Sequence, residues 1–167
     1  HLMKSEEAKT VADFLIAQFE YEMQTTQRVI EAVPNDHLDY RPDSKSKTSL
    51  GLIRHLTLED PWLLNCIADG KFGTLPDDSD ACGISSPAGA AARYKETAPA
   101  ALNRVRAMSG EKLATVVDLM GMMQAPTVNI LGIAVSHSIH HRGQLSAYLR
   151  AMGGKVPSIY GPSADTQ

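Results

Sequence analysis

The sequence predicts an all-α protein, a four-helix bundle with long connecting loops, in one domain over residues 4–167 that ends in a C-terminal tail. Four segments repeat apolar residues at helical spacing, and proline- or glycine-containing stretches separate them. No segment alternates convincingly as a β-strand does. Four long helices in a chain of 167 residues are typical of a bundle.

The first predicted helix runs from about Glu6 to Val33, where Pro34 ends the pattern. A polar connection follows over residues 35–47. It is longer than most connections between bundle helices, and long loops at the end of a bundle can form the walls of a site. The apolar positions of this helix recur at helical spacing: Val11, Phe14, Leu15, Phe19, Met23, Val29 and Val33.

The second predicted helix opens at Thr48 or Ser49, since both residues are good N-caps. It continues to about Asp69, and the following Gly70 can adopt the left-handed conformation that ends many helices. Pro61 lies inside this pattern and cannot donate a backbone hydrogen bond. We therefore expect a kink or a break there.

The third predicted helix begins with Ser86 as cap and Pro87 at the first helical position, and it extends to Met108. A loop rich in Asp, Gly and Pro precedes it over residues 71–85. The stretch from 111 to 124 has no clear period, and a short helical turn with a loop is expected there.

The fourth predicted helix starts near Ala125 and Pro126 and extends to Met152, where two glycines end it. A tail over residues 155–167 contains two prolines and is expected to lie along the surface. Residues 1–3 (His-Leu-Met) resemble a cloning remnant, so His1 is excluded from the site.

Composition excludes several classes of protein. The formal charge is −3 and the basic residues form no stripe, which argues against nucleic acid as a partner. No apolar run reaches the roughly 18 residues that cross a bilayer. No secretory signal peptide is apparent, and Cys66 and Cys82 show no metal or disulfide spacing. The expected protein is cytoplasmic with reduced thiols.

Three histidines lie within five residues of the fourth predicted helix. His137 and His141 are four positions apart, which places their Cβ atoms about 5–6 Å apart on one face. Buried imidazoles need polar partners, and one divalent metal ion satisfies both. The pair therefore predicts a metal site on an inward face, whose other members are apolar or aromatic: Ile130, Ala134, Leu145 and Tyr148.

A third ligand must come from another helix, and His55 on the second helix is the candidate. Glu59 follows it by one turn and could orient His55, act as a general base or serve as a fourth ligand. Three protein ligands leave positions open, as a catalytic metal requires.

Ordinary structural explanations compete with this interpretation. A lone histidine such as His55 is more often a hydrogen-bonded core residue than a ligand. His140 lies on a stripe of small residues, which favours helix packing or support of a ligand over ligation itself. Residues 120–123 contain three methionines, and gap-filling in the core is favoured over a place at the mouth of a pocket.

Two further residues flank the histidine pair. Arg142 and Gln144 could contact an anionic group of a substrate, or they could make surface or interhelical contacts. Cys66 on the second helix is favoured as an inert buried thiol over a reactive one.

The run HSIHHRGQLSAYLR, residues 137–150, resembles the last helix of the DinB (damage-inducible) / YfiT-like superfamily. The stretch SLGLIRH over residues 49–55 resembles the part of that family that contains its first ligand, with Glu59 and Trp62 at familiar spacing. PDSKS at 42–46 and VPSIYGPS at 156–163 are also similar to the family, so the resemblance covers nearly the whole chain.

The resemblance implies a four-helix bundle with a long crossover. It also implies a nickel or zinc ion held by three histidines, which correspond to His55, His137 and His141. Homodimers are frequent in that family. Its characterised relatives include bacillithiol S-transferases and mycothiol-dependent maleylpyruvate isomerase, so a small-molecule substrate, with a thiol as co-substrate, is expected.

Three functional hypotheses follow. The first is a metal-dependent enzyme, either a thiol S-transferase or a hydrolase, in which Glu59 orients a ligand or acts as base. The second is a non-catalytic metal-binding stress-response protein, whose site would be closed by a fourth ligand such as Glu59 or His140. The third is a dimeric scaffold or regulator whose histidines are satisfied by hydrogen bonds.

Overall fold

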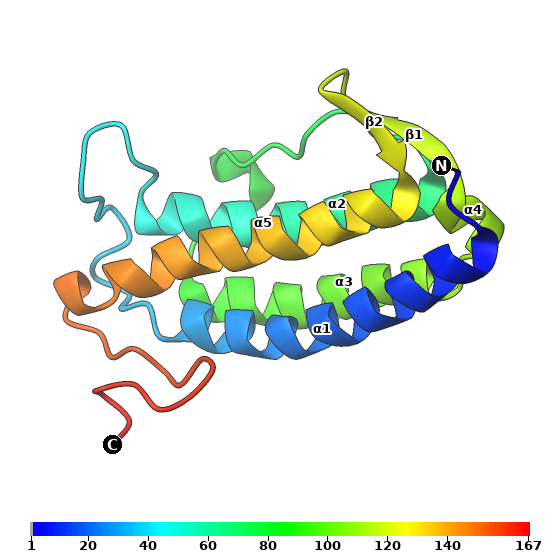
Figure 1. The fold of residues 1–167 in the computed structure, drawn as a ribbon. Helices are drawn as coiled ribbons and strands as arrows, with labels where there is room; N and C mark the ends of the chain where they lie inside the picture. Colours follow the sequence, from blue (N-terminus) through cyan, green and yellow to red (C-terminus); the bar gives the residue numbers. More distant parts are fainter. Residues whose placement is uncertain (1) are drawn as a thin grey trace.

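A computed structural model describes residues 2–167, and His1, which was assigned to a cloning remnant, lies outside the described residues. Four long helices run side by side (Figure 1). Helix α1 packs against α3 and α5, and α2 packs against the same two helices, so that the core lies between all four. The predicted helical bundle is confirmed. The four helices are α1 (Ser5–Glu31), α2 (Ser49–Asp69), α3 (Pro87–Arg106) and α5 (Thr127–Tyr148).

Local sequence accounts for the ends of these helices. The Thr48 hydroxyl accepts a hydrogen bond from the Gly51 N–H at the start of α2, and Ser86 caps α3 in the same way. Gly70 ends α2 with a φ of 70°, a conformation that costs glycine little. These caps confirm the predicted boundaries of α2 and the predicted start of α3.

Helix α2 is continuous through Pro61, so the break considered for that position does not occur. A proline inside a helix costs about 3 kcal/mol because it removes one hydrogen bond and crowds the preceding turn. Leu56 and Leu64 are fully buried on either side of it. Burial of this apolar face offsets the local cost.

A β-hairpin lies between α3 and α5, where the sequence indicated only a helical turn and a loop. After the short helix α4 (Gly110–Ala114), strand β1 (Val116–Leu119) pairs antiparallel with β2 (Met123–Pro126). The expectation that the chain has no strand is therefore wrong. Each strand has only four residues, which is too short for alternation to be distinctive.

Two residues of α1 differ from the apolar pattern that predicted this helix. Val11 is 44% exposed and Phe14 is 70% exposed. The apolar stripe of α1 is wider than the face that α3 and α5 cover. Its inner part, which includes Ile16 and Phe19, is buried in the core.

The tail after α5 crosses the end of the bundle where α1 ends (Figure 1). A 3-10 turn, η2 (Arg150–Met152), continues α5 before Gly153 ends it. Val156 and Ile159 pack against the core, while most of the tail stays at the surface as expected. Within residues 2–167, no helix is long and apolar enough to cross a membrane.

Candidate metal centre

The three histidines singled out by the sequence meet between α2 and α5. We call His55, His137 and His141 the histidine triad. Nε2 of His55 lies 3.2 Å from Nε2 of His137. The ring centroid of His141 lies 4.1 Å from that of His55 and 4.4 Å from that of His137. One ring nitrogen from each residue falls within 4.8 Å of the other two, so the triad could hold a metal ion.

Two neighbouring side chains bind the outer nitrogens of the triad. The Glu59 carboxylate contacts Nδ1 of His55 from one helical turn away. The Gln144 amide oxygen lies 2.7 Å from Nδ1 of His141. A hydrogen bond at Nδ1 fixes the ring and leaves Nε2 for a ligand, as is usual for histidines that bind metals. Both rings therefore present Nε2 to the centre.

The protonation state of the triad also suits a cation. Burial lowers the pKa of His137 below its ordinary value of 6.5, and the neighbouring His55 lowers it further. Burial likewise lowers the pKa of His141, to about 4, although the Gln144 hydrogen bond opposes this shift. These two imidazoles are thus neutral near pH 7, which is the form that binds metal.

Glu59 remains ionised beside them. Burial by itself raises the pKa of this carboxyl, but the hydrogen bond from His55 and the attraction of the histidines in their protonated forms outweigh burial and lower it below 4.5. The carboxylate accepts a hydrogen bond from the Nδ1–H of His55. Because this contact is to Nδ1, Glu59 lies outside the group of converging ligand atoms.

The donor set fits a divalent ion of borderline softness. Three imidazole nitrogens suit zinc and nickel, and the absence of a carboxylate from the ligand group argues against magnesium or calcium. In a neutral His55 that donates from Nδ1, the Nε2 lone pair points at the His137 ring. A cation among the three rings would satisfy these lone pairs together.

His140 is exposed, and its ring centroid lies 4.8 Å from that of His141. Packing against another helix occurs at one end of its stripe, where a Cβ added at Gly132 would lie 3.8 Å from Leu15 Cδ1 of α1, but, within the described residues, not along the rest of it. A Cβ added at Gly143 would meet no atom within 4 Å, and Ser136 and Ala147 are also exposed. Ser136, Gly143 and Ala147 face outward because α1 and α2 cover the other sides of α5.

Arg142 is 2% exposed and pairs with Glu22 of α1. It also donates to the Tyr160 hydroxyl in the tail at 2.9 Å, and that hydroxyl donates to Glu22 at 2.9 Å. Contact with a substrate anion, which the sequence left open for Arg142, is therefore excluded by burial. Glu22 was missed, although a charged residue between the buried Phe19 and Val29 indicates a paired interior position.

A second buried polar cluster also escaped prediction. Asp60, adjacent to Glu59, accepts hydrogen bonds from the Tyr94 hydroxyl at 2.7 Å and the Ser138 hydroxyl at 2.6 Å. Burial raises the pKa of Asp60 to about 6 despite these two donors. The cluster links α2, α3 and α5 directly behind the triad. An aspartate between the buried Leu56 and Leu64 was the available indication.

Two clefts of different chemistry flank the triad. The first, which we call the hairpin cavity, has a volume of about 360 Å³ and includes Glu59 and His137 among its walls. Methionines 120 and 122 line it and are 41% and 73% exposed, so the core gap-filling favoured for this stretch is wrong. The turn of the hairpin carries both methionines to the cavity.

The second cleft, which we call the lysine cleft, has a volume of about 320 Å³ and borders the triad at His141 rather than at His137. His141 and Gln144 form one wall, and Lys45 and Lys47 from the connection before α2 form another. The long connection thus does form a wall of the site. Gln144 acts on His141 rather than standing free for a substrate.

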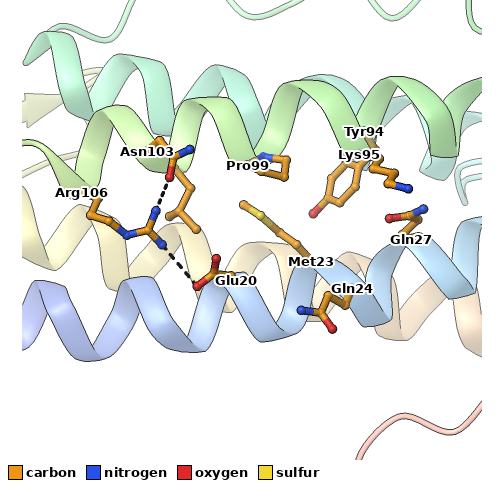
Figure 2. Close-up of a pocket in the computed structure, with 10 residues that line it drawn as sticks. Glu20, Met23, Gln24, Gln27, Tyr94, Lys95, Pro99, Asn103 and Arg106 are labelled. Carbon is orange, nitrogen blue, oxygen red and sulfur yellow. Dashed lines mark hydrogen bonds and ion pairs between the residues drawn. The ribbon is translucent and has the colours of Figure 1, made fainter.

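A third pocket lies between α1 and α3, away from the triad, and no triad residue lines it. Met23 and Pro99 border it, and Glu20 pairs with Arg106 across it at 3.3 Å (Figure 2). Tyr94 lines this pocket while its hydroxyl reaches Asp60. The Asp60 cluster therefore lies between the third pocket and the histidine triad.

The two cysteines are free, as expected. Cys66 is buried, and burial raises the pKa of its thiol. A thiol with a raised pKa is poorly nucleophilic near neutral pH, which agrees with the inert role favoured from the sequence.

Comparisons with known proteins agree with this architecture. The chain is 24% identical over 141 residues to the uncharacterized protein YjoA of Bacillus subtilis (strain 168), covering 83% of this chain and 89% of that protein. It is 25% identical over 154 residues to the uncharacterized protein YrdA of the same organism, covering 92% and 90%.

Solved structures show the same fold. A DinB-like protein from Bacillus cereus superposes with a TM-score of 0.74 at 22% identity, covering 87% of this chain and 95% of that chain. The DinB-like structure of YjoA from Bacillus subtilis superposes with a TM-score of 0.66 at 20% identity, covering 92% and 98%. Residues 8–167 match the DinB family as a whole. With this match, the shared fold and the histidine triad that could hold a metal ion, the chain belongs to the DinB family.

Proposed function

We propose that this protein is a divalent-metal-dependent enzyme that transfers an electrophilic small molecule to the sulfur of a low-molecular-weight thiol. The observation that supports this proposal most is the setting of the triad. Three converging imidazoles, two of them held neutral by burial, lie between an apolar cavity and a polar cleft. A transferase needs room for two substrates at one reacting centre, and this arrangement offers it.

The residues have distinct roles in this proposal. His55, His137 and His141 hold a nickel or zinc ion, which when bound would lower the pKa of a thiol that reaches it. Glu59 positions His55, and Gln144 positions His141. The lowered pKa of Glu59 favours this positioning role over that of a general base, since a weakly basic carboxylate is a poor proton acceptor.

The reaction balances without a further co-reactant. The thiol sulfur forms a bond to a carbon of the electrophile, and the bond between that carbon and its leaving group breaks. The leaving group departs with the electron pair, and the thiol proton passes to solvent. The three histidines would hold the ion that the sulfur approaches, and the two clefts beside the triad give room to position the two substrates.

A hydrolase with the same ligands is the nearest alternative, and thiol dependence of turnover separates it from a transferase. The non-catalytic hypothesis required a site closed by a fourth ligand. Glu59 contacts the outer nitrogen of His55, and His140 is exposed, so neither residue completes the ligand group. This geometry supports an open, catalytic site.

We also propose that the protein forms homodimers. Phe14 and Val11 of α1 are exposed apolar residues, and Leu15 of the same helix lies beside Gly132 of α5. Exposed apolar residues of this kind are typical of a surface that another chain covers. Light scattering on wild type and Phe14→Asp tests the proposal: a dimer that becomes a monomer in the variant supports it, and a wild-type monomer contradicts it.

The enzyme proposal is tested by metal content. Mass spectrometry on protein purified without a nickel column should find about one nickel or zinc ion per chain in wild type. The double variant His137→Ala/His141→Ala should lose the ion, and His140→Ala should keep it as a matched control from the same helix. Wild type with no metal in a folded state contradicts the proposal. If the ion is present, product formation that requires added thiol supports the transferase over the hydrolase.

A further inference from the structure

We infer that the hairpin cavity binds an uncharged aryl or branched-alkyl group of the electrophilic substrate, and that Met120 and Ile133 determine this preference. The identification of the occupant as a substrate rests on the proposed function. The chemistry of the cavity stands on the structure alone. It is a partly open cleft, lined by His137 of the triad and by residues of the β1–β2 hairpin.

The walls of the cavity are apolar everywhere except at the triad. Glu59 and His137 form one end, and the remaining walls come from α2, the loop after it, the hairpin and α5. A ligand there can make polar contacts only at the metal end. The other walls used in this argument are Trp62, Leu63, Leu75, Leu119, Met122 and Ile133.

The volume sets the size of the occupant. An engineered apolar cavity of about 150 Å³ holds benzene. At about 360 Å³, the hairpin cavity has room for a group larger than one aromatic ring. Away from the end formed by Glu59 and His137, a charged group would lose hydration against apolar walls without gaining a partner, so an uncharged group is favoured there.

The backbone conformation at the tip of the hairpin indicates that Met120 contributes to the cavity wall rather than to the stability of the turn. Met120 has a φ of 54° and Gly121 a φ of 73°, and the Met122 N–H donates to the Leu119 carbonyl at 2.9 Å. The two positive φ values and this hydrogen bond fit a β-turn of type I′ over residues 119–122, within the three-residue connection between the paired Leu119 and Met123. Asn-Gly is strongly favoured at the two central positions of such a turn. Methionine in the left-handed region costs about 1–2 kcal/mol relative to glycine. Its thioether lines the cavity, which accounts for a residue that the turn itself disfavours.

Met120→Asn therefore separates a structural role from a binding role. Asparagine suits the turn, so the thermal midpoint of the variant should equal or exceed that of wild type. The same substitution removes part of the apolar wall and should weaken binding of an apolar ligand. If Met120 served only the turn, Met120→Asn would lower the thermal midpoint and leave binding of the apolar ligand unchanged.

The test uses N-phenyl-1-naphthylamine, an uncharged naphthyl compound that accepts energy from tryptophan. Trp62 is the single tryptophan of the chain and lines the cavity, so its fluorescence reports binding. Wild type should show saturable quenching with one probe per chain. The double variant Met120→Asn/Ile133→Gln should raise the dissociation constant of the probe by about tenfold, because it loses apolar contact with the ligand. Val116→Gln, on the same hairpin but outside the cavity and 52% exposed, should leave it unchanged.

Three outcomes overturn the inference: no saturable quenching, equal affinity in the cavity variants and the Val116→Gln control, or loss of stability in Met120→Asn. The variant His55→Ala/His141→Ala removes two triad residues and no cavity wall. It should lose metal but retain the probe. Loss of metal binding and loss of probe binding are thus separate results, so a failure of the proposed function remains distinguishable from a failure of this inference.

Discussion

His141 and Arg142 are neighbours on α5, yet they belong to polar clusters of opposite character. Arg142 is buried and has protein partners in Glu22 and Tyr160, which bond to one another as well. His141 is half-buried beside two other imidazoles, and only its outer nitrogen has a partner, Gln144. In the first cluster the chain itself supplies the counterion and the partners of both terminal guanidinium nitrogens, and only Arg142 Nε has no partner among the described residues. The other cluster directs its unused lone pairs at a common point.

This difference separates a structural cluster from a ligand-binding one more clearly than residue type does. A buried charge is retained in a fold when its partners are supplied by the same chain. Lone pairs that converge without donors from the chain indicate a cation from outside. Substitutions in the first cluster should change stability and leave metal content alone, while substitutions in the second should do the reverse.

The largest effect is expected at the Arg142 cluster. Glu22→Gln leaves the Arg142 charge buried without its counterion and should lower the free energy of unfolding by about 3–5 kcal/mol. Urea denaturation of the metal-free protein measures this change. The double variant Glu22→Leu/Arg142→Met should be far less destabilised, because no charge is left behind. A loss under about 1 kcal/mol for Glu22→Gln would show that the pair does not hold the helices as described.

The Asp60 cluster should show the next largest effect. Asp60→Ala leaves the Tyr94 and Ser138 hydroxyls without their acceptor in the interior, at a cost of about 1–3 kcal/mol each. Ser138→Ala is the control, since Asp60 keeps the Tyr94 bond and the loss should be smaller. Chemical denaturation compares the two variants. Equal losses would mean that Tyr94 finds another acceptor when Asp60 is removed.

A smaller effect, visible in affinity rather than in folding, is expected at Gln144. Gln144→Ala frees the His141 ring and should weaken metal binding by about 10- to 100-fold, as is typical when a residue that orients a ligand is removed. Competition with a chromophoric chelator measures the dissociation constant. His140→Ala changes a nearby exposed residue and should leave it unaltered. An unchanged constant in Gln144→Ala would place His141 outside the ligand group.

The smallest effect is the pH dependence of the metal-free protein. His137 and His141 have lowered pKa values in the fold, so the unfolded chain takes up protons first as the pH falls below 6.5, and stability decreases down to about pH 4. Asp60 acts in the opposite direction, because its pKa is raised to about 6 in the fold. Its contribution to the free energy of unfolding is present below about pH 4 and is lost as the pH rises through 6.

Asp60→Asn removes the contribution of Asp60 to the pH dependence of stability, so that the contribution of the two histidines can be measured without it. Thermal unfolding of the metal-free variant should show stability that rises steadily from pH 4 to 6.5, with a steeper slope than in wild type. A slope equal to that of wild type would mean that Asp60 keeps an ordinary pKa in the fold.

The helices were accessible from the sequence because their determinants are local. Thr48, Ser86 and Gly70 act within one turn of the helix ends they define, and the spacing of His137 and His141 requires only that α5 be helical. The hairpin was not accessible in the same way. Two four-residue strands carry little periodic information, and the positive φ of Met120 contradicts ordinary turn preferences.

The sequence by itself determined the bundle, the histidine pair on one face of α5 and His55 as their candidate partner, since each follows from residues a few positions apart or from a family motif. The other features of the site depend on how the helices pack. Packing brings His55 to His137 across 82 residues, places Glu59 and Gln144 at the outer nitrogens, buries Arg142, and forms one cleft beside His137 and another beside His141. The reason is physical: these features depend on which helix faces pack together, and packing is a property of the whole chain.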